Sequence, residues 1–169
     1  MWLSTAATGS LGNIRRAVRW LISSTCGIVG IITSTGWNCD PYPTKSAAYR
    51  DSVVEAYGAD VHNLMKRSDQ MAFLSLEKEN GCQEMGYWPS VEYIRSRSVM
   101  GSQRAGIKVI GSDNDSEGSE LIIRLADEKD ERPIWACAWG GANTLAQKVQ
   151  ILDNKHFVDL TCTAPFCST

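Results

Sequence analysis

A glycine pair and a bare amide side chain follow an apolar run in this 169-residue chain. The run 135–139 reads WACAW and stops at Gly140-Gly141, after which Asn143 opens a helix-like pattern. Glycine lets a backbone turn sharply or approach another group closely, and an asparagine amide both donates and accepts hydrogen bonds. Asn143 is therefore a candidate ligand-binding residue, and the structural alternative is that it only caps the following helix.

A second polar segment follows another apolar run. Residues 27–33 are nearly all apolar and lead into a segment that carries Trp37, Asn38 and Asp40. An indole ring can stack on a sugar ring, and amide and carboxylate oxygens accept hydrogen bonds from hydroxyl groups. We therefore predict that Trp37, Asn38 and Asp40 bind a small-molecule substrate together with Asn143.

Other reactive residue types form weaker patterns. Gly9 and Gly12 precede a predicted helix and resemble a phosphate loop, but they lack the third glycine and the Lys-Ser/Thr pair. Arg15 and Arg16 beyond them could still receive an anion at a helix N-terminus. The histidines fit exposed positions, and no serine lies in a GxSxG elbow, so the catalytic residues stay unknown.

The alternation of apolar runs and polar turns predicts the elements that position these residues. We predict strands at 2–7, 27–33, 133–139 and 156–161, and helices at 13–24, 44–57, 60–67, 89–99, 116–127 and 142–152. Strands and helices that alternate at this spacing are typical of βαβ units. The fold class is therefore α/β, a single domain with a Rossmann-like, mostly parallel sheet and helices on both faces.

Such a sheet would bring three loops to one edge. The loops 8–13, 34–43 and 140–144 each follow a predicted strand. The carboxyl ends of parallel strands share an edge, and ligands of α/β proteins bind there. We therefore expect Trp37 and Asn143 to lie at the same end of the sheet. Trp88 and Trp139 could also stack on a sugar, although Trp139 fits a buried strand.

Composition narrows the class of partner. The chain is 43% apolar and 21% charged, with a formal charge of -2. This balance gives no electrostatic attraction to nucleic acid or to an anionic membrane, so we expect neither as a partner. No run approaches the ~18 apolar residues of a membrane span, and residues 1–16 lack the pattern of a signal peptide, which leaves the compartment open. The acidic block 113–131 is expected to be a solvated helix and loop.

The six cysteines do not predict a metal site. They are scattered and include no CxxC pair or Cys/His pair at zinc-binding spacing. Cys26 and Cys137 lie in apolar runs and are expected in the core. Cys162 and Cys167 could form a disulfide in an oxidising compartment.

Three stretches resemble a known family. The segments DSEGSELII at 115–123, RPIW at 132–135 and WGGANTLAQ at 139–147 are similar to the nucleoside hydrolase-like domain of bacterial and fungal cellulose-binding proteins. That domain belongs to the inosine-uridine-preferring nucleoside hydrolase superfamily. The segments 28–37 and 55–58 are similar to its second strand and elbow and to the end of its next helix, so the resemblance covers about residues 27–152.

The resemblance implies a calcium-dependent hydrolysis of N-glycosidic bonds. In the family, calcium is held by aspartates after the first strand, by a backbone carbonyl of the loop that corresponds to 140–144, and by a late aspartate. This places Asn143 among the candidate metal residues. The ion binds the sugar diol and a water, and a first-loop aspartate acts as the base on that water. Calcium prefers six to eight oxygen ligands, and a metal-held water needs a nearby base, so this arrangement is chemically coherent.

This chain departs from the family pattern at the metal-binding end. No carboxylate precedes Asp40, and Asn13, Arg15 and Arg16 stand near the expected acidic positions. Two positive charges there would repel a divalent cation by several kcal/mol. Family members also continue beyond the WGGANTLAQ helix, where His156 and Asp159 are poor substitutes for the late site residues.

Two functions follow from this departure. One is a truncated or degenerate nucleoside hydrolase-like domain with impaired hydrolysis and doubtful calcium binding. The alternative is a non-catalytic carbohydrate- or nucleoside-binding module that uses Asn38, Asp40 and Asn143. Calcium binding distinguishes them, because only hydrolysis requires it.

Overall fold

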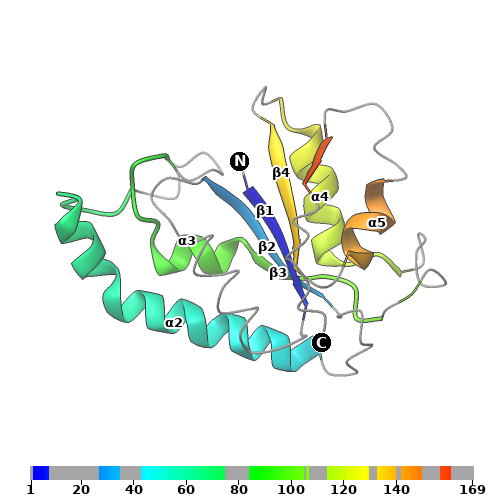
Figure 1. Ribbon diagram of the computed structural model, residues 1–169, viewed down its shortest axis with the longest axis horizontal. Coiled ribbons are helices and arrows are strands. Elements are labelled where there is room, and N and C mark those ends of the chain that lie inside the picture. Colours follow the sequence, from blue (N-terminus) through cyan, green and yellow to red (C-terminus); the bar gives the residue numbers. More distant parts are fainter. Residues whose placement is uncertain are drawn as a thin grey trace, which may run out of the picture.

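The computed structural model shows a sheet at the centre of the molecule with helices on both sides (Figure 1). It describes residues 2–7, 27–34, 43–74, 84–104, 106, 114–129, 133–139, 142–149 and 157–160. The predicted helix 13–24, Cys26 and the loops 8–13, 35–42 and 140–141 lie outside these residues. None of the described helices is both long enough and apolar enough to span a membrane.

The sheet is parallel throughout its described pairings. Its strands, in chain order, are β1 (Trp2–Ala7), β2 (Ile28–Ser34), β3 (Ser98–Met100), β4 (Ile134–Trp139) and β5 (Phe157–Leu160). Their order across the sheet is β3-β2-β1-β4-β5. This is a doubly wound order that reverses between β1 and β4, and it confirms the predicted Rossmann-like α/β class.

One face of the sheet is covered by two helices packed through apolar side chains. They are α2 (Pro43–Arg67) and α3 (Val91–Ser96). The buried stripe of α2 consists of Val54, Tyr57, Val61 and Met65, which pack with residues of β2 and α3. This spacing keeps one face of the helix on the core over about three turns.

The prediction of two helices at 44–57 and 60–67 is wrong, because α2 runs without a break through Gly58. A Cβ at Gly58 would lie 2.8 Å from Val91 Cγ2. The glycine therefore marks a close approach to α3 and does not end the helix. Tertiary packing of the apolar stripe outweighs the weak helix propensity of one glycine.

The helix predicted at 89–99 is also wrong in part. The helix ends at Ser96, and Ser98–Met100 forms β3 at the edge of the sheet. Ile31 N donates to Arg97 O at 2.8 Å, and Gly101 N donates to Thr33 O at 2.8 Å. These bonds to β2 define the strand, which is too short for a sequence period to reveal.

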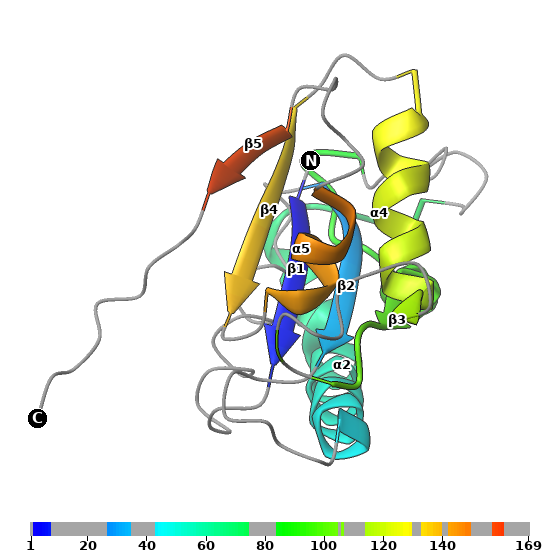
Figure 2. The ribbon, with the colours of Figure 1, turned by 90° about the vertical axis from the view of Figure 1, so that its right-hand side faces the viewer.

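The opposite face is covered by α4 (Glu117–Asp127) and α5 (Asn143–Val149) (Figure 2). Helix α4 begins where it was predicted, because Ser116 and Ser119 form a capping box. Its apolar face of Leu121, Ile122 and Leu125 is buried against β2 and β4. Cys137 of β4 is buried, as expected for a core cysteine.

Candidate functional site

The carboxyl ends of the central strands lie at the same end of the sheet, called the carboxyl edge below. Ala7 of β1 pairs with Ser34 of β2, and Trp139 of β4 pairs with the preceding residue of β1, Ala6. On the other side of β2, Met100 of β3 pairs with Thr33. The segments that follow these strands therefore leave from a common edge. Trp37, Asn38 and Asp40 lie outside the described residues, so their meeting with Asn143 stays a prediction.

A pocket of about 530 Å³ opens where β3 ends and α4 begins. Most of its described lining residues are polar or charged, with carboxylates, amides, hydroxyls and a guanidinium. They are Met100, Gly101, Ser102, Gln103, Arg104, Asn114, Asp115, Ser116 and Glu117. The sequence does not predict this pocket, because the helix predicted at 89–99 overlaps β3 and no element is predicted between 99 and 116. The glycine after β3 and the acidic start of α4 were the only signals.

Asn143 reaches across to this pocket wall. Its Nδ2 donates to Arg104 O at 3.1 Å. Helix α5 begins at Asn143 itself, and the first helical bond runs from Ala146 N to Ala142 O at 2.7 Å. The residue before the helix is therefore Ala142, and the interpretation of Asn143 as a simple helix cap is corrected: its amide group ties α5 to the segment after β3.

The next residue of α5 makes a buried contact with the same segment. Thr144 is fully buried, and its Oγ1 accepts a hydrogen bond from Ser102 N at 2.8 Å. A Cβ on Gly101 would collide with this hydroxyl and would lie 2.7 Å from Ile32 Cγ2. Glycine is thus required at 101 for close packing between the end of β3 and the start of α5.

A third contact joins α5 to the other end of the pocket. Gln147 Nε2 donates to Asp115 Oδ1 at 2.8 Å. Gln147 is 4% exposed, whereas Asp115 is an exposed residue of the pocket wall. Asp115 and Gln147 belong to the DSEGSELII and WGGANTLAQ stretches, so the two stretches that carry the family resemblance meet in space.

The start of α4 is held by its own hydrogen bonds. Ser116 N donates to Ser119 Oγ at 2.8 Å, and Ser119 N donates to Ser116 Oγ at 3.2 Å. A Cβ on Gly118 would lie 2.6 Å from Ile32 Cγ2, so α4 sits directly on β2 at this point. The DSEGS segment therefore supplies a helix cap, a close helix–strand contact and two carboxylates of the pocket, Asp115 and Glu117.

Comparison with known proteins identifies the family of the chain. The family described as cellulose-binding Sde182, nucleoside hydrolase-like domain, matches residues 15–159. The chain belongs to this family.

A solved structure supports this assignment. It is of a nucleoside hydrolase-related hypothetical protein from Saccharophagus degradans that is associated with carbohydrate metabolism, and it matches with a TM-score of 0.68 and 34% sequence identity. The match covers 90% of this chain and 33% of that chain, so the present sequence spans about a third of its length. A comparison with the curated proteins gives no match.

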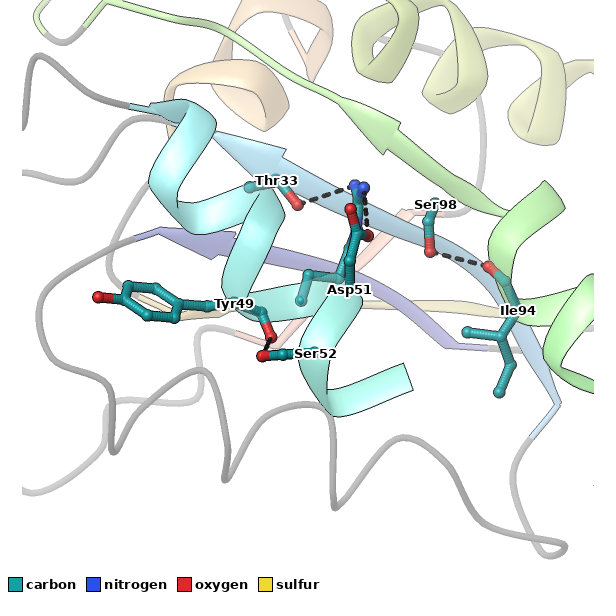
Figure 3. Close-up of polar contacts among 7 residues, drawn as sticks. Thr33, Tyr49, Asp51, Ser52, Ile94 and Ser98 are labelled. Atoms are coloured by element: carbon teal, nitrogen blue, oxygen red, sulfur yellow. Dashed lines mark hydrogen bonds and ion pairs between the residues drawn. The ribbon is translucent and has the colours of Figure 1, made fainter. Parts of the chain in front are cut away.

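Thr33 and Ser34, at the end of β2 in this nucleoside hydrolase-like domain, differ in their hydrogen bonding on the two faces of the sheet. Thr33 Oγ1 accepts a hydrogen bond from Arg50 Nη1 at 3.2 Å, and the same guanidinium pairs with Asp51 at 2.8 Å (Figure 3). Ser34, on the α4 and α5 side, is also fully buried, but its Oγ finds no hydrogen-bond partner within the described part of the chain. Its Cβ lies 3.1 Å from where a Gly101 Cβ would stand, next to Thr144.

The residues present do not fit the calcium site that the resemblance implies. Calcium prefers carboxylate and carbonyl oxygens, yet the sequence has no Asp or Glu before Asp40. Over the described ranges, no three His, Cys, Asp or Glu side chains gather closely enough to hold a metal ion. Between β1 and Asp40 the sequence holds only neutral and basic side chains.

The remaining candidates lie away from the pocket or outside the described residues. Trp88 packs with the α2 and α3 cluster on the other face of the sheet. His62 is exposed on α2, with its ring centroid 5.7 Å from that of Phe73. Asp159 lies in β5, and His156 falls outside the described residues.

Proposed function

We propose that this nucleoside hydrolase-like domain binds a small carbohydrate or nucleoside in the pocket between β3 and α4, and that its hydrolysis of N-glycosidic bonds is impaired. The pocket at the carboxyl ends of the strands, lined mainly by polar and charged residues, carries the proposal. Its volume of about 530 Å³ falls within the roughly 300–1,000 Å³ of small-molecule sites. The pocket lies at the carboxyl ends of the parallel strands, the end of the sheet where α/β proteins bind ligands, although it adjoins the edge strand β3 and not the switch point between β1 and β4.

The chemistry of the lining suits hydroxyl groups. The carboxylates of Asp115 and Glu117 accept hydrogen bonds, the Arg104 guanidinium donates them, and Gln103 and Asn114 do both. A sugar presents alternating donors and acceptors to such a surface. The family description includes cellulose binding, and the similar solved protein is described as associated with carbohydrate metabolism. Both descriptions support a carbohydrate as the ligand, and both also name nucleoside hydrolase, which keeps a nucleoside as the alternative.

We propose that the predicted rim residues complete this site. Trp37, Asn38 and Asp40 follow β2, whose end adjoins β3, and Asn143 already contacts the pocket wall. An indole at this edge would cover one face of a sugar ring while the pocket residues bind its hydroxyls.

Hydrolysis of N-glycosidic bonds is the second candidate, and family membership favours it. A bound calcium ion would supply Lewis-acid activation of a water in that case. The donor residues do not fit such an ion, so we propose that this reaction is weak or lost. Isothermal calorimetry at low ionic strength should show calcium affinity weaker than millimolar, and ribose release from inosine and uridine should be negligible with calcium present. Tighter calcium binding or clear ribose release would support the hydrolase.

The binding proposal is tested by thermal melts with cellotetraose, cellobiose, ribose and inosine. A molecule that binds the folded state raises the melting temperature, and we expect cellotetraose to do so. Glu117→Ala and Arg104→Ala should reduce the shift, because each removes a hydrogen-bonding group of the pocket. Glu92→Ala, an exposed acid on α3 across the sheet, is the matched control and should leave the shift unchanged. If none of the four molecules shifts the melt, the binding proposal fails.

A further inference from the structure

Helix α5 contacts the pocket segment at three points, and each contact uses a polar side chain. Asn143 donates to Arg104 O, and Gln147 donates to Asp115 Oδ1. Thr144 Oγ1 accepts a hydrogen bond from Ser102 N. We propose that these side chains position the pocket for its ligand, and that the Gln147–Asp115 bond orients a carboxylate that the ligand contacts. This inference rests on the proposed binding function and deepens it.

The spacing of the three residues makes the arrangement possible. Residues three and four apart are neighbours on a helix surface, so Gln147 lies beside both Asn143 and Thr144. The bonds of Asn143 and Thr144 hold the segment that follows β3, and the bond of Gln147 holds the residue that precedes α4's cap. One short helix therefore fixes both sides of the pocket.

Burial makes one of these contacts obligatory. The Ser102 amide is buried at the end of β3 and donates to Thr144 Oγ1. A buried N–H that loses an acceptor costs free energy, so removing the hydroxyl at 144 should weaken the junction between α5 and the segment after β3. Gly101 and Thr144 also pack too tightly for a side chain between them. The floor of the pocket is thus rigidly joined to α5.

The Gln147–Asp115 bond has a direct consequence for recognition. Gln147 is buried and held by the helix, whereas Asp115 is exposed, so the bond narrows the range of rotamers that the carboxylate samples. A hydrogen bond from a sugar hydroxyl to a carboxylate depends on angle and distance. Holding Asp115 in one orientation lowers the entropy lost when a ligand binds.

The test is a double-mutant cycle on this pair, with cellotetraose as the probe. In Gln147→Glu the donor becomes a carboxylate facing Asp115, which should push Asp115 away and weaken binding about tenfold, or about 1.4 kcal/mol. In the Asp115→Asn background the same change should weaken binding less than about threefold, because the introduced amide can donate to the new carboxylate. Equal losses in both backgrounds, or no loss, would overturn the inference.

A matched control separates positioning from stability. Gln70 is likewise a buried glutamine, and its Nε2 donates to Ala72 O and Trp88 O, both at 3.1 Å, on the α2 and α3 side. Gln70→Glu should lower the melting temperature but leave the cellotetraose affinity of the folded protein unchanged. If Gln70→Glu and Gln147→Glu weaken binding equally, the effect is general loosening and the inference fails.

A second measurement needs no ligand and distinguishes the two possible failures. The amide of Ser102 should exchange with solvent faster, by about tenfold, in Thr144→Val, and at the wild-type rate in Thr144→Ser, which keeps the acceptor. If cellotetraose does not bind but Ser102 responds this way, the proposed function fails and the coupling of α5 to the pocket segment stands. If Ser102 does not respond, the coupling itself is refuted.

Discussion

The two faces of the sheet use their helices differently. On the α2 and α3 face, the helices bury apolar side chains against β2, with Tyr93 and Ile94 among the most buried. On the α4 and α5 face, an apolar cluster around Ile122 is joined at the carboxyl edge by polar side chains of α5 that reach a pocket. One face thus mainly contributes stability, whereas the other also positions groups that could bind a ligand.

The two faces also differ in what their buried glutamines bind. Within the described residues, Gln70 bonds to backbone groups alone: its Oε1 accepts from Trp88 N at 2.7 Å, and its Nε2 donates to two carbonyls. Gln147 donates instead to the side chain of Asp115 on the pocket wall. The two buried glutamines therefore differ in the kind of group that they bind and not in their burial.

The largest expected effect is at Gly101. Gly101→Ala places a Cβ against Thr144 Oγ1 and Ile32 Cγ2, and it should lower the free energy of unfolding by about 3 kcal/mol. Urea denaturation measures this. Gly58→Ala, across the sheet, meets only the end of the Val91 side chain and gains helix propensity, so it should change stability by less than about 1 kcal/mol. Equal losses of unfolding free energy in the two variants would contradict the idea that the two faces differ in packing.

The next effect is at Gln70. Gln70→Ala leaves the Trp88 amide without its acceptor and should cost about 2 kcal/mol of unfolding free energy. Cellotetraose affinity, measured by calorimetry well below the melting temperature, should not change. A weaker affinity would show that the α2 and α3 face also shapes the pocket.

Replacing Asn143 should affect ligand affinity more than stability, the opposite of the result expected for Gln70. Its bond to Arg104 O is exposed, so Asn143→Ala should lower the unfolding free energy by no more than about 1 kcal/mol. We expect cellotetraose affinity to fall about fivefold, since the pocket wall loses one attachment. Melting curves with and without cellotetraose measure both quantities. A loss of stability with unchanged affinity would leave Asn143 with a structural role alone.

The smallest effect is expected at Asp51. Its carboxylate pairs with Arg50, but its side chain is 53% exposed and the pair is screened by solvent. Asp51→Asn should change the unfolding free energy by less than about 0.5 kcal/mol. A larger loss in urea denaturation would mean that Asp51 holds the Arg50 guanidinium on Thr33, which would give the α2 face its own ordered polar group at the carboxyl edge.

The amino-acid sequence predicts the fold class and both helices of the α4 and α5 face. Alternating apolar runs and polar turns predicted parallel strands, because local periodicity reports which residues are buried. The start of α4 follows from a different local signal, because the helix predicted at 116–127 opens on Ser116, a residue type that favours helix N-caps. The stretches DSEGSELII and WGGANTLAQ also indicate the family to which the chain belongs.

Tertiary structure decided the continuity of α2, the existence of β3 and the make-up of the pocket. Helix α2 passes through Gly58 because its apolar stripe packs on the core and on α3. Strand β3 exists through its bonds to β2, since three residues have no readable period. The contacts of Asn143 with Arg104 and of Thr144 with Ser102 join residues 39 and 42 positions apart. Such contacts depend on how helices pack across a sheet, and no local pattern of residues encodes that distance.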